Sequence, residues 1–275
     1  MNYTKLILLI IFLILFVVLL PFLFTKKEKY QKSTLKVWTY WEPSPPPEIV
    51  QKCYNNWKKM DDLKINFLNP NNVTQYIPKT EYNRISKNSE NLAVKSDFIG
   101  LYLLKTHGGV WIDGSVFLNK PLTEWLPPSK FFTYRADRFG KMGLCMETFF
   151  ISSPKNHIIV HEWYNLLHNI IETPGKEKFI EFVNQKYPLL TDEMDSDYLW
   201  VYVAGKFLLA EKPYLKKFLV TKSAEKGPWY ESEKYGWDNI EQICEILEKN
   251  GPCNDCEMTK LHNGMRKKCS SNVVT

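Results

Sequence analysis

The sequence of 275 residues lacks several features that mark familiar classes of protein. No internal repeat is visible, and the length and the 44% of hydrophobic residues predict one sizeable core. Lysine and arginine number 36 against 30 aspartates and glutamates, and the lysines are scattered among acids. The basic stripe of a nucleic-acid-binding protein is therefore missing, and we expect no nucleic-acid partner. His157 and His161 stand four residues apart, but Glu162 follows the pair, so the zinc-protease pattern is also absent.

The longest stretch without a charged residue lies at the start of the chain, from Leu6 to Phe24. As a helix these 19 residues would span about 28 Å, close to the thickness of a bilayer core. No small-residue cleavage site follows, so we interpret residues 1–24 as a single, uncleaved membrane anchor. Residues 25–34 are polar and predict a short stem, and residues 35–275 are predicted to form the folded domain.

The most informative segment runs from Ser96 to Ser115. Apolar residues recur at helical spacing in its first half, and Gly108–Gly109 then supplies the positive φ that ends a helix. Val110–Ile112 is short and rich in β-forming residues, which predicts a strand. Asp113 follows directly, at the position where an α/β sheet exposes ligand-binding groups. We therefore predict a site at this strand end.

Two acids are brought together by this pattern. Asp97 lies on the predicted helix, and the double-glycine turn folds that helix back beside the strand that carries Asp113. A hard divalent cation bound to a diphosphate needs one or two protein carboxylates, because phosphate and water oxygens complete its shell. The spacing therefore predicts a site for a metal ion and a diphosphate.

Ser-Asp, a helix, Gly-Gly, an aromatic residue and an Asp occur in the same order in a known family. The segment resembles the sugar-transferase families with an Asp-x-Asp region, especially the branch allied to capsular-polysaccharide synthesis proteins. The resemblance covers about residues 36 to 268. Other segments that carry it are Lys36–Glu42, Glu147–Ile151, Ala224–Pro228 and Thr259–His262.

The resemblance implies an α/β domain of GT-A-like, Rossmann type, with a mixed sheet flanked by helices. It implies a glycosyltransferase that uses Mn²⁺ or Mg²⁺ and moves a sugar from a nucleotide-diphosphate sugar to a hydroxyl of a glycan, glycoprotein or glycolipid. Retention of the anomeric configuration is implied as well. Four lysines after the anchor and one before it favour the cytosolic face. The resemblance to membrane-anchored transferases of the secretory pathway implies a lumenal domain of the Golgi or ER type, and this is the location that we expect. The sequence is silent on the oligomeric state.

The resemblance also assigns roles to residues of this chain. Asp113 and Ser115 would hold the metal, and His262 would complete its shell. Asp97 would hold the sugar or ribose, and Glu147 is the candidate carboxylate near the anomeric carbon or the acceptor. The remaining predicted donor-binding residues are Trp38, Tyr40 and Trp41 for the base, Gly109, and Lys260 and Lys267 for the leaving diphosphate.

Two departures from the family pattern leave a second interpretation open. The second acid of Asp-x-Asp is absent, because Gly114 and Ser115 follow Asp113. Gly100 stands where such families carry an arginine, and a glycine inside a helix costs about 1 kcal/mol relative to alanine. Either a ligand or a backbone approaches closely at Gly100, or the site has drifted. The alternative function is therefore an inactive relative that binds sugar or acts as a scaffold.

Four of the six cysteines crowd the C-terminal tail. In a lumenal domain two disulfides would staple this tail, whereas in the cytosol free thiols or a bound metal would be expected. A third interpretation is therefore a membrane-tethered zinc or disulfide module. The cysteines concerned are Cys244, Cys253, Cys256 and Cys269.

Overall fold

The structure is a computed structural model, and it describes residues 34–89, 91–140, 143–173, 175–192, 194–196, 198–270 and 272. The predicted anchor and nearly all of the predicted stem lie outside these residues. Among the described residues, no helix combines the length and the apolar character needed to cross a membrane.

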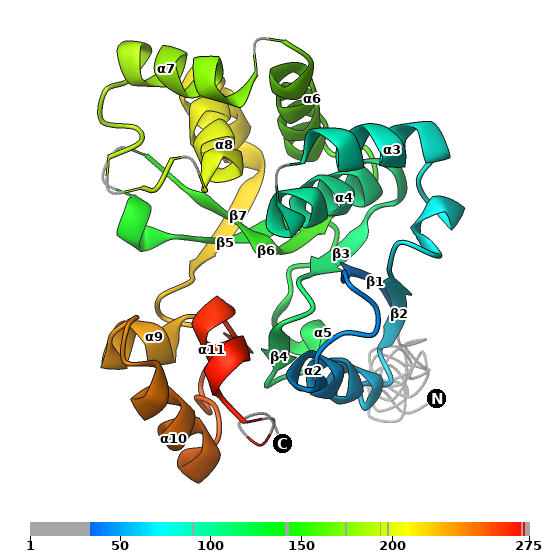
Figure 1. The fold of residues 1–275 in the computed structure, drawn as a ribbon, viewed down its shortest axis with the longest axis vertical. Helices are drawn as coiled ribbons and strands as arrows, with labels where there is room; N and C mark the ends of the chain where they lie inside the picture. Colours follow the sequence, from blue (N-terminus) through cyan, green and yellow to red (C-terminus); the bar gives the residue numbers. More distant parts are fainter. Residues whose placement is uncertain are drawn as a thin grey trace, which may run out of the picture. The chain divides into compact units, whose positions relative to one another are not determined.

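A six-stranded mixed sheet forms the centre of the domain (Figure 1). Its strands lie in the order β2-β1-β3-β6-β5-β7, with β2, β1 and β3 parallel, β6 antiparallel to both of its neighbours, and β7 parallel to β5. The predicted mixed sheet is thus confirmed. The bounds are β1 Leu35–Tyr40, β2 Leu63–Leu68, β3 Gly109–Ile112, β5 Phe131–Arg135, β6 Met146–Ser153 and β7 Leu219–Ser223.

Helices flank this sheet. In Figure 1 the group α3, α4, α6, α7 and α8 lies above the sheet, and α2, α5, α9, α10 and α11 lie below it. The bounds above are α3 Lys79–Asn88, α4 Leu92–His107, α6 Ile158–Glu172, α7 Lys176–Lys186 and α8 Trp200–Glu211. The bounds below are α2 Glu48–Lys58, α5 Leu122–Trp125, α9 Tyr230–Tyr235, α10 Ile240–Asn250 and α11 Asn263–Lys268. Short 3₁₀ turns occupy Val73–Gln75, Asp137–Phe139 and Pro213–Phe218.

Side chains of strand β3 alternate between the two layers. Trp111 packs into the core under α4, α6 and α8, whereas Val110 and Ile112 pack into the core on the opposite face. This alternation follows from the two-residue period of a strand. Asp113 therefore directly follows the C-terminal end of a central strand that is buried on both faces.

The predicted helix, turn and strand are confirmed. The Asn91 side chain caps α4 by accepting a hydrogen bond from the Val94 N–H at 2.9 Å, and Gly108 ends the helix with φ of +65°. Gly109 follows with φ of +109°, and a Cβ there would lie 2.5 Å from the carbonyl oxygen of Lys36. Both glycines are thus required by the turn and by the close approach of β3 to β1.

The glycine in the middle of α4 has a structural explanation. A Cβ at Gly100 would lie 2.6 Å from Cδ2 and Cε2 of the Trp111 indole, which is 1% exposed. The missing side chain therefore lets α4 lie directly against β3. Of the two explanations considered for Gly100, the close approach of another element therefore suffices, and drift of the site is not needed to explain it.

A second, two-stranded sheet joins the C-terminal segment to the loop after Asp113. Strand β4 (Val116–Leu118) pairs antiparallel with β8 (Met258–Lys260), and Val116 lies opposite Lys260. The main chain continues this pairing, because the N–H of Leu261 donates to the carbonyl oxygen of Ser115 at 2.9 Å. Residues almost 150 positions apart in sequence are thus held side by side.

The cysteines of the tail form two disulfides. Cys244 on α10 is bonded to Cys269, which directly follows α11, and Cys253 is bonded to Cys256 in the loop before β8. The expectation of a disulfide-stapled tail agrees with this pairing.

Candidate functional site

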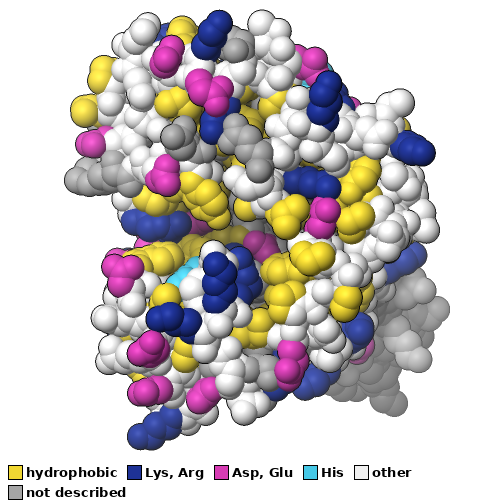
Figure 2. Space-filling view, in the orientation of Figure 1, with side chains coloured by type: hydrophobic (Ala, Val, Ile, Leu, Met, Phe, Trp, Pro, Cys, Tyr) yellow, Lys and Arg dark blue, Asp and Glu magenta, His cyan; other side chains and the backbone are white. Residues whose placement is uncertain are grey.

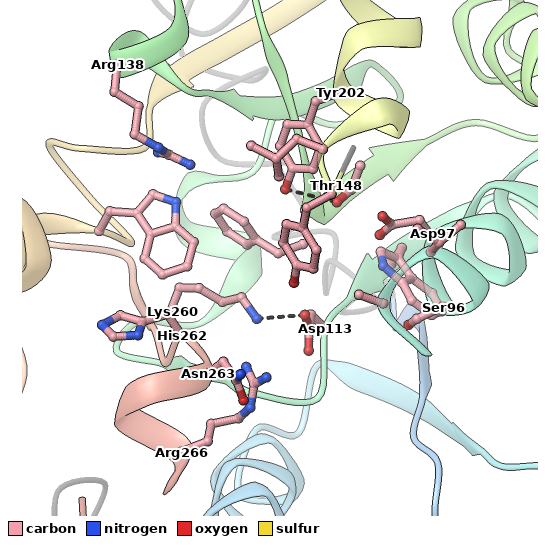
Figure 3. Close-up of a pocket in the computed structure, with 17 residues that line it drawn as sticks. Ser96, Asp97, Asp113, Arg138, Thr148, Tyr202, Lys260, His262, Asn263 and Arg266 are labelled. Atoms are coloured by element: carbon pink, nitrogen blue, oxygen red, sulfur yellow. Dashed lines mark hydrogen bonds and ion pairs between the residues drawn. The ribbon is translucent and has the colours of Figure 1, made fainter. Parts of the chain in front are cut away.

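A cleft of about 240 Å³ opens where β3 and β6 meet the N-terminal half of α4 and the C-terminal segment. Figure 2 shows a hollow on this face, with apolar side chains inside it and lysine and arginine side chains at its rim. The residues that line the cleft are Ala93, Val94, Ser96, Asp97, Trp111, Asp113, Arg138, Thr148, Phe149, Tyr198, Leu199, Tyr202, Trp229, Lys260, His262, Asn263 and Arg266 (Figure 3).

A smaller hollow of about 180 Å³ adjoins this cleft. It lies at the end of β1 and is lined by Tyr40, Trp41, Glu42 and Leu92. Both hollows also share four lining residues, which are Ala93, Ser96, Asp113 and Arg266. A ligand that filled both would therefore pass directly over Asp113 and Arg266.

Asp113 lies at the centre of a hydrogen-bonded cluster. Its Oδ2 accepts from the Lys260 ammonium at 2.6 Å, and its Oδ1 accepts from the backbone N–H and the hydroxyl of Ser115 at 3.1 and 3.2 Å. Burial by itself would raise the pKa of Asp113, but the charges of Lys260 and Arg266 lower it below its ordinary value. Asp113 is therefore an ionised carboxylate held in place by a buried cation.

Lys260 is fixed as firmly as its partner. Its side chain is buried, and its Nζ also donates to the Ser115 hydroxyl at 2.5 Å. Its backbone N–H donates to the carbonyl oxygen of Pro228 at 2.9 Å. The ammonium is thus positioned by two strands and two acceptors and is not a mobile surface charge.

Arg266 supplies a second cation to the cluster. It donates to the Ser115 hydroxyl at 3.2 Å and to the carbonyl oxygen of Leu261 at 2.9 Å. Its guanidinium also lies over the Trp41 ring, 5.7 Å from the centroid. Arg266 was not among the residues predicted from the sequence, although it lies one turn after His262 and within the part of the chain that the resemblance covers.

Asp97 projects from α4 into the same cleft, above Asp113 in Figure 3. Burial is the main cause that raises its pKa to about 8; an interaction with Thr148 opposes the rise, and the Asp113 charge contributes to it. At neutral pH the group is therefore mostly a neutral acid that can donate a hydrogen bond. The structure brings Asp97 and Asp113 together as the sequence predicted.

Glu147 lies behind the cleft wall and does not reach its surface. The side chain is fully buried, and its Oε1 accepts from Arg138 at 2.8 Å and from the Trp229 indole at 3.0 Å. Its Oε2 accepts from the Tyr202 hydroxyl at 2.9 Å. All three partners line the cleft. Glu147 therefore holds cleft residues in position. The prediction that its carboxylate lies beside the sugar or the acceptor is corrected, because the side chain is buried behind the cleft wall.

Arg138 is held by a second carboxylate as well. It donates to Glu225 at 2.8 Å, and its guanidinium lies 4.9 Å from the centroid of the Trp237 ring. The sequence analysis did not single out Arg138, Tyr202 or Trp229. No short motif marks them, because they come from three separate segments that meet only around Glu147.

Three residues predicted to bind the donor lie away from the cleft. Trp38 is 1% exposed, and its indole N–H donates to the Gly108 carbonyl oxygen at 2.8 Å, so it is a core residue. Gly109 serves the approach of β3 to β1 described above. Lys267 is exposed on α11 and lines neither hollow.

Tyr40 and Trp41 do border the smaller hollow. The Tyr40 hydroxyl donates to Glu42 at 2.7 Å, so its orientation is fixed. The Trp41 indole nitrogen is buried and has no hydrogen-bond partner among the described residues. A Cβ at Gly114 would lie 2.8 Å from the Trp41 ring, which explains why glycine follows Asp113.

His262 does not converge with Asp113 and Ser115. It caps α11, with Nδ1 accepting from the Gly264 N–H at 3.2 Å, and its ring centroid lies 5.9 Å from that of Trp237. Burial and the charges of Arg266 and Lys260 together lower its pKa to about 4. In Figure 3 the Lys260 side chain lies between the His262 ring and Asp113.

The residues predicted to hold Mn²⁺ or Mg²⁺ do not fit a divalent cation in this arrangement. The Lys260 ammonium donates to both Asp113 and Ser115, the two oxygen ligands that were predicted, and His262 lies beyond it. Within the described part of the chain, no group of three or more His, Cys, Asp or Glu side chains is placed to hold a metal ion.

Sequence comparison finds one family. Its description is capsular polysaccharide synthesis protein, and its model matches residues 20–195, which is more than half of the chain. The matched part contains Asp97, Asp113 and Glu147, whereas Lys260 and Arg266 lie beyond it. No curated protein gives a significant match.

Solved structures with a similar arrangement include three glycosyltransferases. The PaToxG glycosyltransferase is 14% identical over 65% of this chain and 79% of its own, with a TM-score of 0.40. The UDP-bound glycosyltransferase domain of the YGT toxin is 9% identical over 81% and 87%, with a TM-score of 0.43. The glycosyltransferase GlyE of Streptococcus pneumoniae TIGR4 is 12% identical over 83% of this chain and 54% of its own, with a TM-score of 0.39.

Proposed function

Because the chain belongs to the capsular polysaccharide synthesis protein family, we propose that it transfers a sugar from a nucleotide-diphosphate sugar to a hydroxyl of a glycan, glycoprotein or glycolipid. The membership confirms the family predicted from the sequence and agrees with the predicted enzyme class, a glycosyltransferase. The observation that carries the proposal is the cluster of Asp113, Lys260 and Arg266, which lies where the two hollows meet.

The two hollows divide the donor into its parts. The smaller hollow offers the flat ring of Trp41, which lines it, as a partner for the base and ribose. Arg266 stands at the junction and Lys260 lies beside it on Asp113, where a diphosphate would lie. The larger cleft is lined by Asp97, which suits the hydroxyl groups of a sugar, and by aromatic side chains such as Trp229, which suit its apolar face.

The reaction exchanges one bond of the anomeric carbon for another. The bond from that carbon to the β-phosphate oxygen breaks, and its electron pair stays on the departing nucleoside diphosphate. The acceptor hydroxyl oxygen forms the new bond, and its proton passes to the departing phosphate oxygen or to solvent. The protein's contribution is to hold cations where negative charge grows, because preorganised charge is most effective in a site shielded from water.

We propose Asp97, in place of Glu147, as the carboxyl group that faces the sugar. Asp97 lines the cleft, whereas both oxygens of Glu147 are bonded to cleft-wall residues. With a pKa raised to about 8, Asp97 can donate a hydrogen bond to a sugar oxygen at neutral pH. Retention of the anomeric configuration stays a prediction of the family resemblance, and the anomer of the product tests it.

A membrane-anchored enzyme with its domain on an oxidising side of the membrane remains our proposal for its location. The bonds Cys244–Cys269 and Cys253–Cys256 support it, because disulfides persist in such compartments. Labelling of the domain by a membrane-impermeant reagent on intact cells or sealed vesicles tests this proposal.

Release of nucleotide from a panel of nucleotide sugars tests the function. The full chain in detergent is incubated with UDP-, GDP-, ADP- and dTDP-sugars, with and without simple sugar acceptors. Asp97→Ala, which removes the carboxyl group, serves as the site variant, and Lys268→Ala on the exposed end of α11 serves as the control. Release that the site variant loses and the control keeps would support the proposal.

Two other outcomes discriminate between the candidates. Binding of a nucleotide sugar without release, under any condition of the panel, would favour the inactive relative that binds sugar. A folded chain that neither binds nor turns over any member of the panel would refute the transferase.

A further inference from the structure

The cleft contains a cation of its own at the place where the sequence predicted a metal ion. Lys260 Nζ lies 2.6 Å from Asp113 Oδ2 and 2.5 Å from Ser115 Oγ. It therefore occupies the bridging position between the two oxygen ligands that the family resemblance assigned to Mn²⁺ or Mg²⁺.

The hydrogen bonds of the predicted ligands leave little capacity for a second cation. Asp113 Oδ1 accepts two hydrogen bonds from Ser115, and Ser115 Oγ also meets Arg266 at 3.2 Å. A divalent ion at these oxygens would replace the ammonium and would stand beside the remaining guanidinium. The chemistry of the cluster is that of an ion pair and not of a vacant shell of hard oxygen ligands.

The fold holds both cations from behind. Pairing of β8 with β4 fixes the main chain at Lys260, and the carbonyl oxygen of Leu261 anchors Arg266. The disulfide Cys244–Cys269 ties the end of α11 to α10. Arg266 belongs to the wall that the two hollows share, and Lys260 lines the larger cleft beside Asp113, which is also in that wall, so both cations stand where a diphosphate would lie. They are thus prepositioned charges on rigid elements, as electrostatic stabilisation of a leaving group requires.

We propose that Lys260 and Arg266 take the place of the divalent cation, so that this chain binds its donor and transfers the sugar without a metal ion. As the bond between the anomeric carbon and the β-phosphate oxygen breaks, the electron pair stays on that oxygen and the two side chains stabilise the new charge. The acceptor's proton passes to the departing phosphate oxygen or to solvent. This inference rests on the proposed transfer from a nucleotide sugar.

Binding of nucleoside diphosphates provides a test that does not depend on turnover. The full chain in detergent is titrated by calorimetry with UDP, GDP, ADP and dTDP, each in EDTA and in MnCl₂. We expect the affinity for the preferred nucleotide to be equal in the two conditions. Mn²⁺ without any nucleotide, followed by its paramagnetic resonance signal, should not bind to the wild type.

Variants separate the cation from the fold. Lys260→Met should lower nucleotide affinity in EDTA by about 10- to 100-fold, the value expected for one charge-assisted hydrogen bond. Lys260→Arg keeps the charge and should recover part of that loss. Lys268→Ala removes an equal charge from the exposed end of α11, where it pairs with Glu241, and should change nothing. Far-UV circular dichroism of each variant confirms that it is folded.

The outcomes distinguish this inference from the function on which it rests. Nucleotide release that proceeds equally in EDTA and in MnCl₂ supports both. Release or tight nucleotide binding that requires Mn²⁺ overturns the inference and leaves the transferase intact. Wild-type affinity in Lys260→Met also overturns it. If no nucleotide binds in either condition, both the transferase and the inference fail.

Discussion

Replacement of Gly100 by alanine tests the contact that holds α4 against β3, the two elements that carry Asp97 and Asp113. The added Cβ would lie 2.6 Å from two atoms of the Trp111 indole, which is buried in the core and cannot swing away. Overpacking of this kind costs about 1–3 kcal/mol. Because the buried indole cannot shift, we expect the upper part of this range, about 2–3 kcal/mol. Alanine gains about 1 kcal/mol of helix propensity, so the expected net loss in the free energy of unfolding is about 1–2 kcal/mol.

Thermal and urea denaturation of the full chain in detergent measure this loss. For a domain of this size, the expected change corresponds to a fall in Tm of about 3–6 °C. Gly205→Ala in α8 is the matched control, because the nearest atoms of Trp163 lie 3.0 and 3.1 Å from its added Cβ. A small shift of that ring relieves the contact, so the control should lose clearly less stability than Gly100→Ala.

A double-mutant cycle decides whether the indole is the cause. Trp111→Phe removes part of the ring that meets the new Cβ, so the cost of Gly100→Ala should shrink in that background. A Gly100→Ala variant as stable as the wild type would refute the reasoning. An equal cost in the two backgrounds would show that another contact forbids a side chain at Gly100.

Three further predictions follow from the site. Glu147→Gln removes the charge of a buried ion pair and should lower the free energy of unfolding by about 2 kcal/mol in urea, whereas a loss below about 0.5 kcal/mol would make the network dispensable. Asp97 has a pKa raised to about 8 in the folded state, so the folded chain binds the extra proton and stability falls as pH rises from about 4 to 8. In a site sealed from water, the free energy of unfolding would fall by about 5 kcal/mol over this range, but water in the cleft screens the group, so we expect a fall of about 1–2 kcal/mol. Urea denaturation at several pH values should show this fall in the wild type and a flatter profile in Asp97→Asn; the same profile in both would contradict the shift. Cys244→Ser breaks the Cys244–Cys269 bond, which spans 25 residues, and should lower the free energy of unfolding by about 3 kcal/mol. Cys253→Ser breaks a bond that spans only 3 residues and should cost clearly less; equal losses in the two variants would contradict the loop-closure account.

The sequence predicted the local pattern around Asp113 well. Periodicity, the double glycine and the short β-rich run predicted a helix, a turn and a strand, and α4, Gly108–Gly109 and β3 have that order. Such features depend on neighbours within a few residues, so they can be inferred without the fold. The juxtaposition of Asp97 and Asp113 follows from the same turn.

The roles of single aromatic and acidic residues were harder to predict. Trp38 and Glu147 stand at strand positions that looked suitable for a ligand, yet both are buried. The side of the sheet to which a side chain points can be inferred from its period, but what covers that side depends on distant segments. For Glu147 these are the segments of Arg138, Tyr202 and Trp229.

The sequence by itself determined the family, the position of the predicted anchor and the acidic residue at the end of a buried strand. Only the tertiary structure decided what neutralises that residue. The partner of Asp113 lies 147 positions away, on a strand that pairs with β4, and no local pattern encodes such a pairing. An ammonium held by two strands can stand where a sequence motif predicts a metal, because the motif specifies the ligands and the fold specifies the cation.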